Sequence, residues 1–140
     1  MIDEVAIQQT INRYSEAASR ADWSAVVATY APDGVWVIAS SGTTFEGRDA
    51  IREGLGKMSG AMEFVVQINA PAVIDVSGDT ATARSVIREA GRVKGSDETF
   101  EALGFYADSL VRTSEGWRFS RRTFELKGLH RNPMVPGSAR

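Results

Sequence analysis

The chain has 140 residues, of which 43% are hydrophobic and 24% are charged, an ordinary composition for a single globular domain with a buried core. This composition argues against an intrinsically disordered or a membrane protein. The 16 basic and 18 acidic residues give a net charge of −2, which offers no electrostatic basis for nucleic-acid binding. The chain has no cysteine and its first residues do not resemble a signal peptide, so we expect a cytoplasmic protein.

The chain begins with a helical pattern of apolar residues. Apolar residues recur three and four positions apart from Val5 to Ala18, which predicts an amphipathic helix. Asp22 is the expected N-cap of a second, short helix. We expect this helix to continue through Tyr30 and to end at the turn formed by residues 32–34.

After residue 34 the helical spacing of the apolar residues gives way to the alternation that is typical of strands. Residues 35–38 predict a strand, and an apolar stripe predicts a third helix over residues 48–58. The following strands are expected over residues 62–69, 72–76, 80–93, 100–112 and 117–126. Three helices followed by an antiparallel meander predict an α+β fold with the helices packed on one face of a curved sheet. We expect one domain over residues 1–127 and a separate tail over residues 128–140.

Short motifs along the chain carry a family resemblance. They are Tyr14 and residues 22–23, 31–36, 47–51, 76–81, 104–108 and 116–119. In this order and spacing the chain resembles the SnoaL-like domains of the nuclear-transport-factor-two-like cone superfamily. The resemblance implies a curved antiparallel or mixed sheet around a pocket for a small apolar ligand, and a homodimer formed through the exposed face of the sheet. Relatives include scytalone dehydratase, ketosteroid isomerase, polyketide cyclases and non-catalytic binders, so the fold alone does not determine the function.

The Asp–His dyad of the dehydratases and cyclases in this family is absent. Ala18 and Ser19 occupy the positions at which those relatives carry a Tyr–Asp pair. Glu63 lies near the position of one pocket histidine, and Glu89 or Gly91 near that of a second. The imidazole mechanism of those relatives is therefore not expected here.

Glu89 is the first candidate for chemistry. Alternation along residues 80–93 places it on one face with small and apolar side chains, including Ile87. A carboxylate in such surroundings has a raised pKa, which suits a general base or acid. The alternative is a carboxylate that is solvated or paired with Arg92.

Tyr106 and Asp108 form the second candidate pair. They share a strand face with Ala102 and Gly104, whose small size would leave room for a ligand. A tyrosine donor beside an acid is the arrangement with which ketosteroid isomerase polarises a carbonyl group. The alternative is a purely structural role, with Asp108 paired to an arginine such as Arg122.

Other residues complete the predicted pocket. The predicted substrate-binding set is Tyr14, Trp36, Glu63, Ile87 and Arg122, next to the catalytic set Glu89, Tyr106 and Asp108. Glu63 could carry a proton in place of the missing histidine, or could simply be solvated; Tyr14 and Trp36 could equally be core. The lone histidine, His130, falls in the expected tail. The sequence contains no His/Cys cluster and no phosphate-binding glycine loop, so we expect no metal and no cofactor.

Two functions remain open at this point. The first is a cofactor-independent isomerase, dehydratase or cyclase that acts on a small apolar oxygenated molecule through carboxylate and tyrosine acid–base chemistry. The second is a non-catalytic protein of the same fold that binds a small ligand.

Overall fold

The computed structural model describes residues 2–133, and its main element is a curved, unclosed sheet of seven strands. The strands are β1 (Tyr30–Ile38), β2 (Thr44–Glu46), β3 (Met62–Asn69), β4 (Val73–Ser77), β5 (Thr80–Val93), β6 (Glu98–Thr113) and β7 (Gly116–Pro133). Their order is β2-β1-β7-β6-β5-β3, with β4 also paired to β5. β1 runs parallel to β7 and the other pairs are antiparallel. The predicted α+β fold with a mixed sheet is confirmed.

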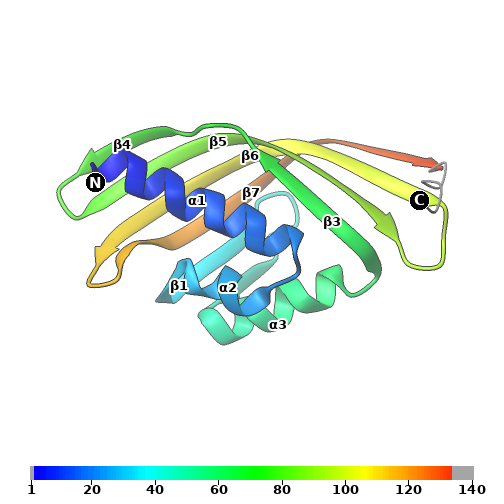
Figure 1. Ribbon diagram of the computed structural model, residues 1–140, viewed down its shortest axis with the longest axis horizontal. Helices are drawn as coiled ribbons and strands as arrows, with labels where there is room; N and C mark the ends of the chain where they lie inside the picture. Colours follow the sequence, from blue (N-terminus) through cyan, green and yellow to red (C-terminus); the bar gives the residue numbers. More distant parts are fainter. Residues whose placement is uncertain (1, 134–140) are drawn as a thin grey trace.

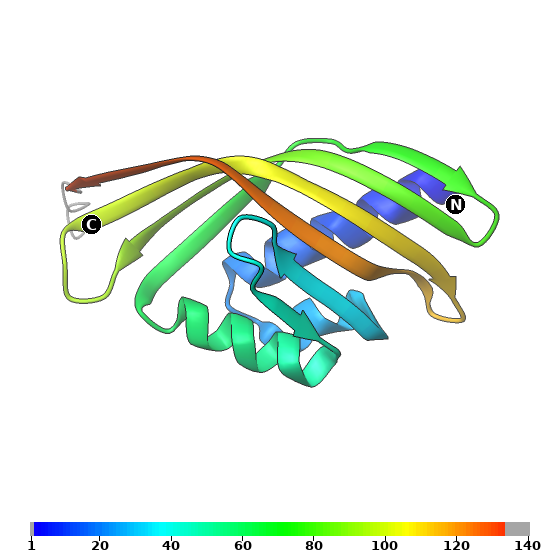
Figure 2. The same cartoon turned by 180° about the vertical axis from the view of Figure 1, so that it is seen from behind.

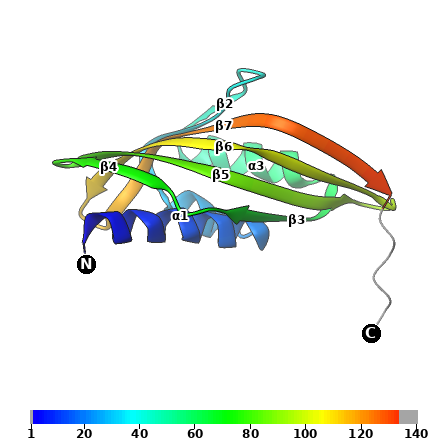
Figure 3. The ribbon, with the colours of Figure 1, turned by 90° about the horizontal axis from the view of Figure 1, so that it is seen from above.

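The helices are α1 (Asp3–Ser19), α2 (Trp23–Ala28) and α3 (Arg48–Ser59). α1 crosses one face of the sheet diagonally, and the view from above shows it as a separate layer (Figures 1 and 3). α3 contacts β1 and β2 at one edge of the sheet and β3 at the other. Seen from behind, the long strands β5, β6 and β7 lie in front of α1, and α3 lies below them (Figure 2). The helices therefore cover the concave side, where a pocket can form.

The first two helices form for the reasons that the sequence indicates. α1 buries the apolar stripe that includes Ile7, Ile11 and Tyr14 against the sheet. The side chain of Asp22 accepts a hydrogen bond from the amide of Ala25, at 3.1 Å, and so caps α2 as predicted. No helix in the described part of the chain is long and apolar enough to cross a membrane.

Two expected boundaries are wrong. Tyr30 does not end the second helix but begins β1. Its ring packs against that of Phe119, with the ring centroids 5.3 Å apart, and its backbone pairs with β7. The last strand does not end near residue 126, because β7 stays paired with β6 as far as Pro133. The short strand β2 was not predicted. At both boundaries pairing with a distant strand outweighs the local sequence preference.

Candidate functional site

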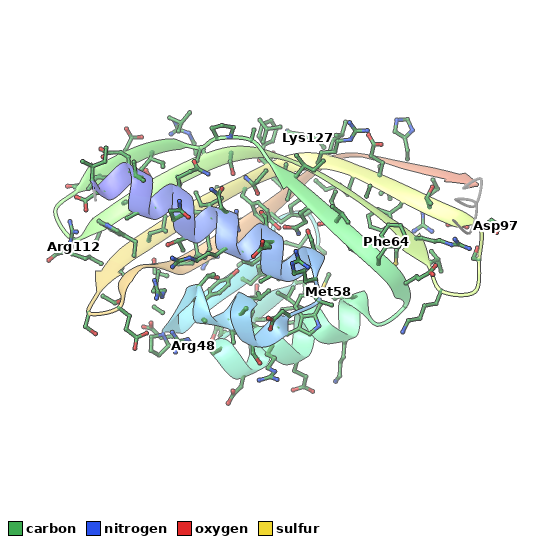
Figure 4. The ribbon with its side chains drawn as sticks, viewed as in Figure 1. Arg48, Met58, Phe64, Asp97, Arg112 and Lys127 are labelled. Carbon is green, nitrogen blue, oxygen red and sulfur yellow. The ribbon has the colours of Figure 1, made fainter. Side chains whose placement is uncertain are left out.

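A cavity of about 220 Å³ lies between the helices and the inner face of the sheet. Its wall is mostly apolar and aromatic, and it includes Tyr14, Trp36, Leu55, Met58, Phe100 and Phe124. Met58, near the end of α3, lies below the end of α1 in Figure 4. The ring of Trp36 is held by stacking on Phe45, with the ring centroids 5.5 Å apart. A concave, largely apolar cavity with a few polar groups is the usual form of a small-molecule site.

Three polar side chains meet in this cavity. The Nε2 atom of Gln67 donates to Oε2 of Glu89 at 2.8 Å and to the hydroxyl of Tyr106 at 3.3 Å. The amide nitrogen must face the carboxylate, because an ionised carboxylate can only accept hydrogen bonds. Gln67 of β3 thus links the carboxylate of Glu89 on β5 to the phenol of Tyr106 on β6, and all three side chains line the same cavity.

Glu89 lies where alternation along β5 places it. Residues 81, 83, 85 and 87 on the same face are buried, and Glu89 itself is half-buried at the cavity wall. Burial raises the pKa of its carboxyl, and the hydrogen bond from Gln67 opposes that shift. The alternative pairing with Arg92 is wrong, because Nε of Arg92 instead lies 3.1 Å from Oε2 of Glu63.

Tyr106 supplies a hydroxyl that stays protonated. Burial raises its pKa well above the usual value for tyrosine, and the pKa of Tyr14 is also raised by burial. The Tyr106 oxygen accepts a hydrogen bond from Gln67, and a side-chain hydrogen bond with the neighbouring Tyr14 raises the pKa of Tyr106 further. A further buried atom of the cavity residues, Oε1 of Gln67, has no hydrogen-bond partner among the described residues. A ligand hydroxyl group could donate a hydrogen bond to this oxygen.

Asp108 and Arg122 lie outside the cavity wall and are completely buried together. Nε of Arg122 is 3.0 Å from Oδ1 of Asp108, an ion pair in which the N–H is not aligned as a hydrogen bond. The guanidinium carbon lies 3.6 Å from the ring centroid of Tyr106, 4.3 Å from that of Tyr14 and 4.6 Å from that of Phe119. Burial raises the pKa of Asp108 to about 6, while the Arg122 charge opposes the shift. The structure therefore places the pair behind the two tyrosines rather than facing the ligand space.

The remaining predicted residues divide between the cavity and other places. Tyr14 and Trp36 line the cavity, whereas Ile87 is fully buried in the core. Glu63 lies outside the cavity wall with its side chain 53% exposed, and His130 is exposed opposite Glu101 of β6. Gly104 does not leave ligand space, because a Cβ there would lie 2.2 Å from the carbonyl oxygen of Glu125, where β6 and β7 shift register.

Gln67 is the functional residue that the sequence analysis missed. Alternation along β3 could have indicated it, since Gln67 shares a face with Val65, which also lines the cavity. The described residues contain no group of three His, Cys, Asp or Glu side chains that could hold a metal ion.

The chain is similar to known proteins in both sequence and fold. A family model described as a SnoaL-like domain matches residues 1–123. An NTF2-like protein with a cystatin-like fold from Novosphingobium aromaticivorans is 28% identical, with a TM-score of 0.76 over 89% of this chain and 81% of that chain. A candidate scytalone dehydratase from the same organism is 24% identical, with a TM-score of 0.81 over 96% and 92% of the two chains. The hexachlorocyclohexane dehydrochlorinase LinA-type3 from Novosphingobium barchaimii is 14% identical, with a TM-score of 0.84 over 95% and 94%.

The last two similarities, at 24% and 14% identity, establish a shared fold and nothing about chemistry. No functionally curated protein matches the chain significantly. The family model, by contrast, spans the helices and nearly all of the sheet. The chain therefore belongs to the family of SnoaL-like domains.

Proposed function

We propose that the protein is an enzyme that acts on a small, largely apolar, oxygenated molecule by proton transfer, as an isomerase, dehydratase or cyclase does. The observation that carries this proposal is the placement of Glu89 and Tyr106 in one apolar cavity, joined by the amide of Gln67. A half-buried acid with a raised pKa and a protonated phenol form an acid–base pair without a histidine.

The two groups take different roles. The ionised carboxylate of Glu89 removes a proton from a carbon of the ligand, and the resulting carboxylic acid returns it to another carbon or to a departing hydroxyl group. The hydroxyl of Tyr106 donates a hydrogen bond to the ligand oxygen on which negative charge develops. Asp108 and Arg122 touch no ligand in this scheme; Arg122 packs against the rings of Tyr14 and Tyr106, and Asp108 balances its charge.

A ligand screen by thermal unfolding tests the proposal. A ligand at 100 times its dissociation constant should stabilise the protein by about 2.7 kcal/mol, and each such compound is then incubated with the protein and analysed for conversion. Ala18 lines the cavity, so the larger side chain of Ala18→Phe should fill part of it. This variant should still fold but should no longer be stabilised by the ligand. Ligands that bind in the cavity but are never converted would instead favour the alternative function, a non-catalytic binding protein.

We also propose that two copies pair through the sheet face that points away from α1. This face exposes large apolar side chains on adjacent strands, among them Val86 and its cross-strand neighbour Phe105, at 54% and 40% exposed. Contiguous exposed apolar surface of this kind marks an interaction site. The ion pair of Arg88 and Glu101, at 2.9 Å, adds a polar contact to the same pair of strands.

Val86→Glu is expected to convert the dimer into a monomer, because it places a charge in the centre of the apolar face. Light scattering coupled to size exclusion measures the mass directly. The control is Val5→Glu, which adds the same charge at an exposed apolar residue of α1 and should leave the dimer intact. A wild-type protein that is monomeric at micromolar concentration would overturn the proposal.

A further inference from the structure

A second cavity, of about 260 Å³, lies between α1, α2 and the beginning of β7. Its wall contains the small residues Ala17, Ala25 and Ala28, which leave the space open. It also contains three arginines from two elements of the fold: Arg13 on α1, Arg20 directly after α1 at its C-cap, and Arg118 on β7. The cavity shares no lining residue with the site described above.

These arginines differ from most of the other described arginines in having no carboxylate partner. Five other arginines have a carboxylate within 4 Å, namely Arg88, Arg92, Arg112, Arg122 and Arg131. Within residues 2–133, none of the three cavity arginines forms such an ion pair.

Arg118 is held in place by a hydrogen bond and also has an N–H group with no partner among the described residues. Its Nη1 atom donates to the carbonyl oxygen of Trp117 at 2.9 Å, which fixes the guanidinium group. Its Nε atom is buried and has no hydrogen-bond partner in the described part of the chain. A buried N–H without an acceptor is costly, so an acceptor supplied by a ligand would stabilise it.

The acidic side chains of this cavity do not neutralise the positive charge of its arginines. Its wall holds two carboxylates, Glu16 and Asp22, against the three guanidinium groups. Asp22 is used to cap α2, and Glu16 forms no ion pair with any described residue. The two threonines of the wall are also engaged, since Thr10 donates to the carbonyl of Trp117 and Thr29 to that of Val26. The charge left over in the cavity is positive.

We propose that this cavity binds a small oxyanion, either a phosphate or a carboxylate group, between Arg13, Arg20 and Arg118. Guanidinium groups present paired N–H donors that match two oxygens of either anion, and charge-assisted bonds of this type are the strong ones. The two cavities are lined by adjacent residues of the same chain segments. Tyr14, Ala18 and Trp23 line the first cavity. Each of them directly follows a residue that lines the second, namely Arg13, Ala17 and Asp22. The two cavities therefore share backbone segments of α1 and of the start of α2.

Titration of the ¹⁵N-labelled protein with inorganic phosphate and, separately, with acetate tests the site, with sodium chloride at matched ionic strength as the reference. We expect saturable shifts of the amides of residues 13–28 with at least one of the two anions, and the stronger response identifies the anion. The double variant Arg13→Gln/Arg20→Gln should weaken binding roughly tenfold or more, because it removes two of the three cations that would bond to the anion. Glu16→Gln should tighten it, because it removes a negative charge from the wall.

The matched control is Arg52→Gln/Arg84→Gln, which removes two exposed arginines outside both cavities and should leave the affinity unchanged. Three results would overturn the proposal. They are shifts that do not saturate, shifts that chloride reproduces at equal ionic strength, or an equal loss of affinity in the control. None of these outcomes depends on whether the first cavity is catalytic.

Discussion

Arg122→Met is expected to lower the free energy of unfolding by about 3–5 kcal/mol, because it leaves the carboxylate of Asp108 buried without a cation. Both side chains are 0% exposed and their charged atoms lie 3.0 Å apart. The substitution also removes the cation from the ring of Tyr106, a contact at 3.6 Å that is worth about 2 kcal/mol when desolvated. Denaturant unfolding followed by circular dichroism measures the loss.

A double variant separates the ion pair from packing. Arg122→Met/Asp108→Leu replaces both charges with apolar side chains, and buried ion pairs exchanged in this way often leave stability unchanged or increased. We expect it to be more stable than either single variant, so that the four proteins of the cycle show strong coupling. If the effects of the two single substitutions simply add, the pair does not act as a unit.

The same double variant reveals the titration of Asp108. Its pKa is raised from the usual 3.8 to about 6 in the folded protein, so folded molecules bind a proton that unfolded ones release. This contribution to stability is complete below about pH 4 and is lost as the pH rises through about 6. The wild type should therefore gain stability relative to the double variant as the pH falls from 7 to 4. A difference that does not change with pH would show that burial does not raise this pKa.

Glu89→Gln is expected to reduce turnover of a compound found in the ligand screen by roughly 10²–10⁴-fold, the usual contribution of a general base. Glutamine has the shape of glutamate and can still accept from Gln67, but it cannot exchange a proton at neutral pH. Binding of the compound should change only a few-fold. Steady-state kinetics and calorimetric titration measure the two quantities separately.

Glu63→Gln is the matched control for this variant. Glu63 is exposed, pairs with Arg92 and lies outside the cavity wall, so its neutralisation should leave turnover unchanged. In the wild type the rate should rise with pH through the raised pKa of Glu89, above the usual range for glutamate, and this limb should vanish in Glu89→Gln. Equal losses in the two variants, or full activity in Glu89→Gln, would mean that Glu89 is not the base.

Local patterns in the sequence predicted much of the secondary structure. The strand expected over residues 80–93 is β5, with the same bounds, and the third helix ends one residue beyond its expected end. Alternation also showed which residues share a face of β5 and of β6, and the family resemblance implied that the face of Tyr106 and Asp108 points towards the pocket. These features depend on side chains two to four residues apart, whose spacing the sequence states directly.

What the sequence alone determined was therefore the class of fold, the family and the face of each strand on which the polar candidates lie. The tertiary structure decided which of them reach the ligand space. Glu89 and Tyr106 line the cavity, whereas Asp108, two residues further along the same face, is covered by Arg122. Alternation places a side chain on one side of a sheet, but its depth depends on the curvature of the sheet and on the helices packed against it. Those are set by contacts between residues far apart in the chain, which no local pattern records.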